Sequence, residues 1–379
     1  MTKKLFVVCA VAGLLLSLAV AVLAHDEKSD TKPGEKVERS LAVDAGAVVT
    51  LCVSSGTLRV RGWEKSEIRV RSLDATQIDF RRIDKVKDAS KPPTRIDVMV
   101  LNKSTGTNPK FDCQAIADVE MEVPAGATVQ VQTRDGDIII AGVAGAYAGS
   151  QNGDIAIERA TKLVEAGSVG GSISLKDSTG RINLSSAGGG VEAINIRAAS
   201  DEDTFDVGTV SGDIQLDRVS NPKVTAKTVN GTVIMSGPLA KSGWYGLTNI
   251  TGDIVLAMPH DASFQLNAKV SDKHDIVSDF NLKYLSDATP PPPPPAVKPK
   301  TPEAKGKTPE MKGKTPETKG KTPTTGPQPI PKVGPVIAPI VVEKAAMPYV
   351  LRRVSAVCGS GDATISIASF GGTVRLKKI

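Results

Sequence analysis

The chain has little of what catalysis, metal binding or nucleic-acid binding usually needs. Only 3% of its residues are aromatic, which leaves too few rings for a platform on which nucleic-acid bases stack. Three histidines and four cysteines, with no Cys-x-x-Cys pair, offer no cluster for a soft metal such as zinc. We therefore expect no cofactor and no catalytic residue set.

Positive charge is concentrated in one part of the chain. The formal net charge is +6 at pH 7, and residues 286–342 alone carry nine lysines against four acidic residues. The first 24 residues add two more positive charges, so the remainder is close to neutral. A nearly neutral folded part lacks the broad basic surface that nucleic acids require, and we predict no nucleic-acid partner.

The N-terminus has the layout of a secretory signal peptide. An apolar run from Leu5 to Leu23 follows two lysines and ends in a small-residue cleavage box at Ala24. We predict cleavage after Ala24, a polar leader over residues 25–37, and export to the periplasm, the outer envelope or the extracellular space. The alternative is an uncleaved N-terminal membrane anchor, since about 20 apolar residues can span a bilayer.

Export would permit a disulfide, and the chain after residue 24 keeps three cysteines. Because three is odd, at most one pair forms within the chain and at least one thiol is left over. We favour the pair Cys52 with Cys113, since both lie in the N-terminal third, which leaves Cys358 free.

A glycine-led phrase recurs along the chain and is the strongest structural signal. Each copy has a turn residue, the glycine, a small or acidic residue and then alternating aliphatic residues, as in Asn152 to Ile157. Copies follow one another every 17 to 22 residues, which is typical of one coil of a β-solenoid. We expect each glycine to make a tight turn with positive φ. The leading glycines are Gly136, Gly153, Gly171, Gly190, Gly212, Gly231, Gly252 and, near the C-terminus, Gly372.

The strand pattern predicts an all-β solenoid with two main strands in each coil. The second and fourth residues after most of these glycines are aliphatic, as at Ile138 and Ile140, so they form columns that stack inward. Before the repeats, alternating apolar residues between Arg39 and Arg71 predict a β-meander. We place the solenoid domain at residues 38–285.

The composition changes abruptly after residue 285. Residues 286–342 contain an unbroken proline run and a seven-residue Lys-Gly-Lys-Thr-Pro repeat with a proline in each copy. Proline excludes a regular helix, so this segment is predicted to be a disordered, extended linker. The strand pattern returns over residues 343–379. We predict that the linker is inserted into one domain and that these C-terminal strands complete and cap the solenoid.

Several stretches resemble the bacterial putative-adhesin family, whose members are also called toast-rack domains. The matching text is Val-Asp-Ala-Gly at residues 43–46 and Gly-Thr-Leu-Arg-Val-Arg-Gly-Trp at residues 56–63, then the repeats and the closing Gly-Gly-Thr-Val-Arg-Leu. The resemblance covers about residues 40–285 and 343–379. It implies an exported β-solenoid of undefined function with envelope or adhesion roles, and it brings no catalytic residues.

An acidic column after the glycines is the most attractive candidate site. Asp137 and Asp154 follow glycines in adjacent coils, and stacked carboxylates can bind Ca²⁺. The simpler interpretation is that each aspartate caps its turn by accepting backbone N–H groups. A glycan-cleaving enzyme on a β-helix needs paired carboxylates, or a base aided by Arg, Lys or a metal, gathered on one face. Arg159 and Arg218 share one position within their coils, but two coils lie between them and no acidic pair accompanies them.

The sequence therefore favours a non-enzymatic exported module that presents a binding surface to a protein or glycan in the cell envelope or outside the cell. One alternative is a carbohydrate-active enzyme that acts on an extracellular polysaccharide. Another is a purely structural module that carries a basic tether. The lysines of that tether are candidates for binding an anionic polymer or lipid headgroups through salt-sensitive attraction.

Overall fold

The computed structural model describes residues 36–84, 90–102, 113–271, 273–285 and 351–379, all within one unit, Gly34–Ile379. These residues form strands and no helix, which confirms the predicted all-β solenoid. The predicted signal peptide, nearly all of the leader and the linker lie outside the described residues. Within the described part, no helix has the length and apolarity that a membrane crossing needs.

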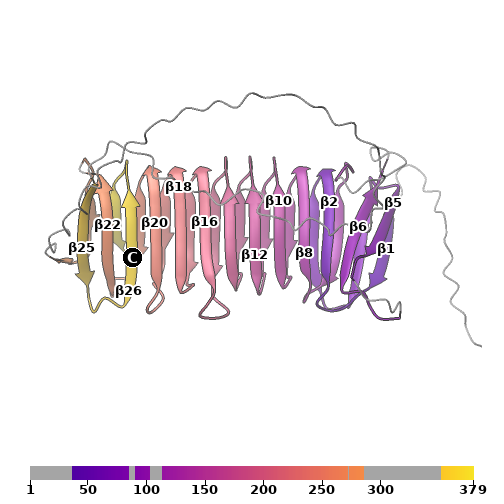
Figure 1. Cartoon of the computed structure of the whole chain (residues 1–379), viewed down its shortest axis with the longest axis horizontal. Helices are drawn as coiled ribbons and strands as arrows, with labels where there is room; N and C mark the ends of the chain where they lie inside the picture. Colours follow the sequence, from indigo (N-terminus) through magenta and orange to yellow (C-terminus); the bar gives the residue numbers. More distant parts are fainter. Residues whose placement is uncertain (1–35, 85–89, 103–112, 272, 286–350) are drawn as a thin grey trace, which may run out of the picture. The chain divides into compact units, whose positions relative to one another are not determined.

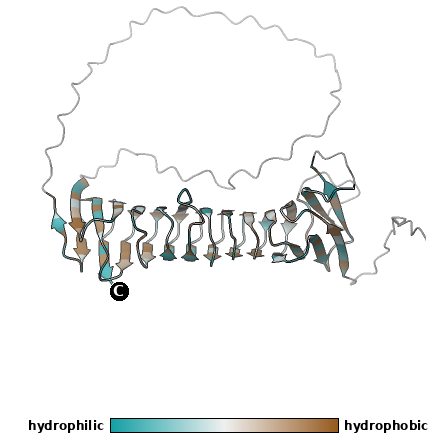
Figure 2. Cartoon of the chain, turned by 90° about the horizontal axis from the view of Figure 1, so that it is seen from below, coloured by the Kyte–Doolittle hydropathy of each residue, from teal (hydrophilic) through white to brown (hydrophobic). Residues whose placement is uncertain are grey.

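Two largely parallel sheets face one another, and most coils contribute one strand to each (Figure 1). Figure 2 shows the two sheets as facing rows of strands. The 14-stranded sheet contains, in spatial order, β24 (Lys283–Tyr284), β25 (Leu351–Cys358), β22 (Phe264–Ser271), β26 (Ala363–Ser369), β20 (Trp244–Thr251), β18 (Lys223–Asn230), β16 (Thr204–Ser211), β14 (Arg181–Ser186), β12 (Leu163–Ser168), β10 (Gly145–Ser150), β8 (Thr128–Asp135), β2 (Val48–Ser55), β6 (Arg95–Leu101) and β5 (Gln77–Arg82).

The second sheet has 13 strands, most of them shorter than those of the first sheet. In spatial order it contains β1 (Val37–Ala42), β4 (Glu67–Ser72), β7 (Val119–Pro124), β3 (Leu58–Trp63), β9 (Ile138–Ala141), β11 (Ile155–Glu158), β13 (Ile173–Lys176), β15 (Val191–Ile196), β17 (Ile214–Val219), β19 (Val233–Ser236), β21 (Ile254–Met258), β27 (Val374–Lys378) and β23 (Ile276–Ser278).

The aliphatic residues after each glycine stack in the core as the repeat pattern predicts. Ile155 pairs in register with Ile138 on one side and with Ile173 on the other, and all three are at most 1% exposed. Strand residues alternate between faces, so the equal spacing from the glycine keeps one column inside through every coil. Burial of each such side chain contributes about 1.5–3 kcal/mol, which makes the repeat register itself a source of stability.

The predicted N-terminal meander is wrong. Its strands are present, but β2 and β3 belong to different sheets, where β2 pairs in parallel with β8 and β3 with β9. The alternation of apolar residues had two interpretations, a half-buried hairpin or the inner face of a coil, and the structure has the second. Only β1 and β4 pair directly in antiparallel orientation within this segment.

The C-terminal strands do not simply follow the last coil. β26 lies between β20 and β22, and β27 lies between β21 and β23, so the final coil in sequence is an interior coil in space. β25 pairs in antiparallel orientation with the outer side of β22. The segment that precedes the linker and the segment that follows it are therefore interleaved in one core.

Candidate functional site

The aspartate column joins successive coils through backbone hydrogen bonds. Oδ1 of Asp137 accepts the N–H of Asp154 at 2.9 Å, and Oδ1 of Asp154 accepts the N–H of Ser172 at 2.8 Å. Asp213 and Asp253 do the same for the equivalent residues of the next coils. The described residues hold no group of three or more metal-ligating side chains. These contacts give the aspartates the backbone-capping role that the turn chemistry predicts.

The repeats need glycine at the leading position because the backbones of successive coils approach closely there, and not because the residue has a positive φ. A Cβ atom on Gly153 would lie 1.9 Å from the carbonyl oxygen of Gly136 in the preceding coil, and the same clash recurs along the column at 1.7 to 2.4 Å. Of the predicted glycines only Gly252 has positive φ, so the expected turn geometry is wrong for the others. Gly190 is also misassigned, because Gly189 is the residue stacked on Gly171.

A buried hydroxyl column beside the glycines was missed by the sequence analysis. Ser168 Oγ donates to the carbonyl of Gly153 at 3.0 Å and accepts the N–H of Gly171 at 2.9 Å, and its side chain is fully buried. The signal was present as Ser, Thr or Asn three residues before each glycine. The column consists of Thr133, Ser150, Ser168, Ser186, Thr209, Thr228, Asn249 and Ser369.

The two arginines of the enzyme hypothesis occupy a left-handed corner of the coil. Arg159 and Arg218 have φ of 53° and 52°, as do the intervening Asp177 and Asn195 at 49° and 56°. Arg218 Nε donates to Asn195 Oδ1 at 2.5 Å, and the Asn195 amide donates to Asp177 at 2.9 Å. The shared position predicted from the repeat is therefore a corner where polar side chains bond along the stack.

The side chains of Trp63, Trp244 and Tyr245 are dispersed over both sheets. Tyr245 is fully buried and its hydroxyl accepts the N–H of Ala240, while Trp244 on the same strand is 37% exposed. Trp63 lies in the other sheet, with the Arg69 guanidinium 4.6 Å from its ring centre. These rings do not form a common stacking surface.

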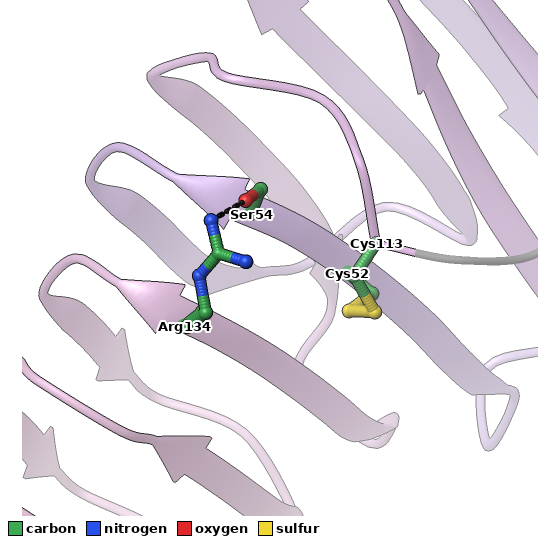
Figure 3. The surroundings of a disulfide bond; sticks show 4 residues. All are labelled: Cys52, Ser54, Cys113 and Arg134. Atoms are coloured by element: carbon green, nitrogen blue, oxygen red, sulfur yellow. Dashed lines mark hydrogen bonds between the residues drawn. A yellow bond between two sulfur atoms is a disulfide. The ribbon is translucent and has the colours of Figure 1, made fainter.

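The disulfide joins Cys52 on β2 to Cys113 (Figure 3). A pocket of about 690 Å³ lies beside it on the outer face of the 14-stranded sheet. The pocket extends over β2, β8 and β10. It is lined by Cys52, Ser54, Cys113, Gln114, Ile116, Gln132, Thr133, Arg134, Gly149 and Gln151.

Short contacts fix one wall of this pocket. The N–H of Ser54 donates to the carbonyl of Ala115 at 2.7 Å, and Ser55 forms a parallel bridge with Ile116. Together with the disulfide they hold the chain after Cys113 against the edge of β2. Ile116 is 57% exposed here, so an apolar side chain borders the opening.

The positive charge of Arg134 in the pocket is balanced by the neighbouring Asp135. Arg134 Nη2 donates to Ser54 Oγ at 2.9 Å (Figure 3), and Arg134 Nε donates to Asp135 Oδ2 at 2.9 Å. Hydrogen bonds from the Asn152 amide and from Arg134 hold the pKa of Asp135 below its ordinary value. Asp135 is therefore ionised at neutral pH and neutralises the guanidinium.

Two further carboxyl groups with shifted pKa values lie at the N-terminal end of the solenoid. Hydrogen bonds from Arg82 and Thr94 lower the pKa of Asp84 to about 2, and burial raises the pKa of Asp97. Asp97 on β6 pairs with Arg81 on β5, and Asp84 joins Arg82 at the end of β5 to Thr94 just before β6, so both carboxyl groups link these two strands.

An apolar row runs along the same outer face from the pocket towards the C-terminal coils. It occupies the position directly after the buried hydroxyl column, where Arg134 and Gln151 stand in the first two coils. Val169 and Val210 in this row are 44% and 36% exposed. The apolar row consists of Val169, Ala187, Val210, Val229, Ile250 and Phe370.

Residues 117–284 match the family model described as Toastrack DUF4097. Among the curated proteins no significant match was found. Similar solved structures include one described as a putative adhesin from Parabacteroides merdae, with 11% identity, 60% of this chain and 90% of that chain covered and a TM-score of 0.36. Another, described as a putative lipid binding protein from Parabacteroides distasonis, has 16% identity, coverage of 59% and 90% and a TM-score of 0.36.

A third similar structure is described as a putative adhesin from Bacteroides fragilis, with 12% identity, coverage of 91% and 97% and a TM-score of 0.35. None of the three descriptions names an enzyme. The family match confirms the resemblance that the glycine-led repeats indicated. Residues 117–284, with their stacked glycine, aspartate and hydroxyl columns, are a Toastrack domain of the DUF4097 family.

Proposed function

We propose that the protein is a non-enzymatic binding module, exported to the cell envelope or beyond, that presents the outer face of its 14-stranded sheet to a protein or glycan. The apolar row carries this proposal. Six successive coils place an apolar residue at one outer position, and Val169 and Val210 expose more than a third of their surface. Contiguous exposed apolar surface on a soluble fold marks interaction sites, whereas scattered apolar residues do not.

Rigidity supports the same function. The position of each residue in the row is set by hydrogen bonds between coils, such as those of the hydroxyl and aspartate columns. A surface held in this way binds without a large ordering cost, which favours a fixed recognition face over a mobile one.

Binding to isolated envelope material of the source cell tests the proposal. We expect saturable sedimentation of the purified protein with this material, and the substitution Val210→Asp should weaken it at least about tenfold, because a charge would be buried at the interface. Ile234→Asp is the matched control, since Ile234 is similarly exposed, at 38%, on the other sheet. Equal effects of both substitutions, or no saturable binding, would contradict the proposal.

The enzyme alternative has a separate test. The protein should release no reducing ends from a panel of neutral and acidic polysaccharides, because the arginine corner brings no paired carboxylates to one face. Depolymerisation of any polysaccharide would replace the binding function with a catalytic one.

The basic linker is proposed to add weak attraction to anionic glycans or lipid headgroups. The support is its composition, nine lysines against four acidic residues over residues 286–342. Such attraction between exposed charges is screened by salt. Binding to vesicles that contain anionic lipid should therefore fall between low and high salt and should disappear when residues 286–342 are deleted; unchanged binding after the deletion would remove the linker from this role.

A further inference from the structure

We propose that the pocket beside the disulfide Cys52–Cys113 binds a neutral saccharide unit. This inference deepens the proposed function, since it names a glycan as a ligand, but it uses a part of the sheet that lies apart from Val210. The volume of the pocket, about 690 Å³, falls within the range of about 300–1,000 Å³ that is usual for small-molecule sites.

The lining offers hydrogen-bonding groups that the protein does not use. The side-chain amides of Gln132 and Gln151 have no hydrogen-bond partner among the described residues, and neither does Arg134 Nη1. These groups point out of the sheet with the outward residues of β8, so a ligand on this face can supply their missing partners and gain affinity from them.

The pairing of donors with acceptors matches a sugar ring. Each glutamine amide carries one acceptor and two donors, and each sugar hydroxyl both donates and accepts. Gln132 lies on β8 and Gln151 directly follows the neighbouring β10, two residues beyond Gly149, which pairs in register with Gln132. Two neighbouring hydroxyls of one ring can therefore bond one amide while a third reaches the other.

Charge selects a neutral ligand over an anionic one. Among the described residues that line the pocket, Arg134 is the only charged one, and its ion pair with Asp135 neutralises it. A carboxylate or phosphate in the pocket would meet the Asp135 charge as well as the guanidinium, so it would gain little from the site.

The position of the pocket disfavours a peptide. Extended peptides usually bind by adding a strand to a free sheet edge, where backbone groups are unpaired. The floor of this pocket is the outer face of β2, β8 and β10, and β8 is paired on both sides. Ile116 and the disulfide supply apolar surface against which the C–H face of a sugar ring can pack.

Gly149 provides a test that leaves the polar groups intact. It lies in the pocket floor on β10, its φ is not in the left-handed region, and alternation directs its side-chain position outward, as for its register partner Gln132. Gly149→Val should therefore fill the pocket. Gly167→Val is the matched control, because Gly167 is the register partner of Gly149 in the next coil and does not line the pocket.

The experiment is calorimetric titration of the disulfide-bonded protein with maltose, lactose and N,N′-diacetylchitobiose, beside glucuronic acid, inorganic phosphate and a neutral tripeptide. We expect saturable binding of at least one neutral sugar. Gly149→Val should abolish it, Gly167→Val should leave it unchanged, and Gln132→Ala with Gln151→Ala should weaken it about tenfold.

Three results would overturn the proposal: no saturable binding of any neutral sugar, tighter binding of the acid, phosphate or tripeptide, or sugar binding that survives Gly149→Val. Thermal melts of every variant establish that the fold is intact. Val210→Asp separates the two proposals, since it should weaken binding to envelope material while sugar binding to the pocket persists.

Discussion

Replacement of Gly153 by alanine should destabilise the solenoid strongly, although the change adds a single methyl group. The new Cβ would lie 1.9 Å from the Gly136 carbonyl oxygen, where ordinary contact begins at 3.4 Å. The obstructing atom belongs to the backbone, so no side-chain rotation can relieve the clash. The two coils must separate locally.

The magnitude follows from what this separation breaks. Overpacking in a dense interior costs about 1–3 kcal/mol. Movement of the coil also strains the hydrogen bond of Ser168 to Gly153 and that of Asp154 to Asp137, each worth about 1 kcal/mol. We expect Gly153→Ala to lower the free energy of unfolding by roughly 3–5 kcal/mol.

Gly149→Ala is the matched control, because it lies in the same coil but faces outward. Its methyl group meets the pocket, and loss of glycine freedom in the unfolded chain should stabilise the protein by about 0.4–1 kcal/mol. Urea unfolding followed by circular dichroism measures both variants. A change of less than about 0.5 kcal/mol for Gly153→Ala, or equal effects of the two substitutions, would refute the close-stacking explanation.

Three further predictions concern single features. Cys52→Ser with Cys113→Ser should lower the free energy of unfolding by about 4 kcal/mol, from the loop of 61 residues that the disulfide closes, while Cys358→Ser should change it little in the same urea experiment. Asp154→Ala should cost about 1 kcal/mol through the lost cap, and the wild-type melting temperature should be equal in calcium and in chelator; a calcium-dependent rise would restore the metal interpretation. Asp84 stabilises the folded state above its ordinary pKa of 3.8 and loses this effect as the pH falls towards its folded pKa of about 2. Between these two pH values the free energy of unfolding of the wild-type protein should therefore fall more than that of Asp84→Asn. An equal fall in both proteins would contradict the lowered pKa of Asp84.

The sequence predicted the repeat and the inward residues because both follow from spacing alone. Ile155 and Ile157 keep the same distance from their glycine as Ile138 and Ile140, and a period of two fixes their side of the sheet. The sequence could not show why glycine stands at these positions, since a turn with positive φ and a close contact between coils both require glycine. Gly189 and Gly190 could be told apart only by the coil beneath them.

Other features depend on contacts that no local pattern contains. The interior place of β26 depends on which strand accepts it, and the phrase at Gly372 is compatible with any position in the stack. The pocket arises where residues 113–116 lie beside β2, held there by the disulfide and by the bridge of Ile116 with Ser55. The apolar row was readable as an apolar residue one position after six of the eight members of the hydroxyl column, but its exposure was not.

The interior position of β26 and β27 constrains the order in which the molecule can be completed. β20 and β21 precede β22 and β23 in synthesis, yet the strands that separate them are the last to be made. Until the C-terminus has been made, β20 and β22 lack the strand that joins them in the finished sheet. This end of the solenoid can therefore close only after synthesis of the chain has ended.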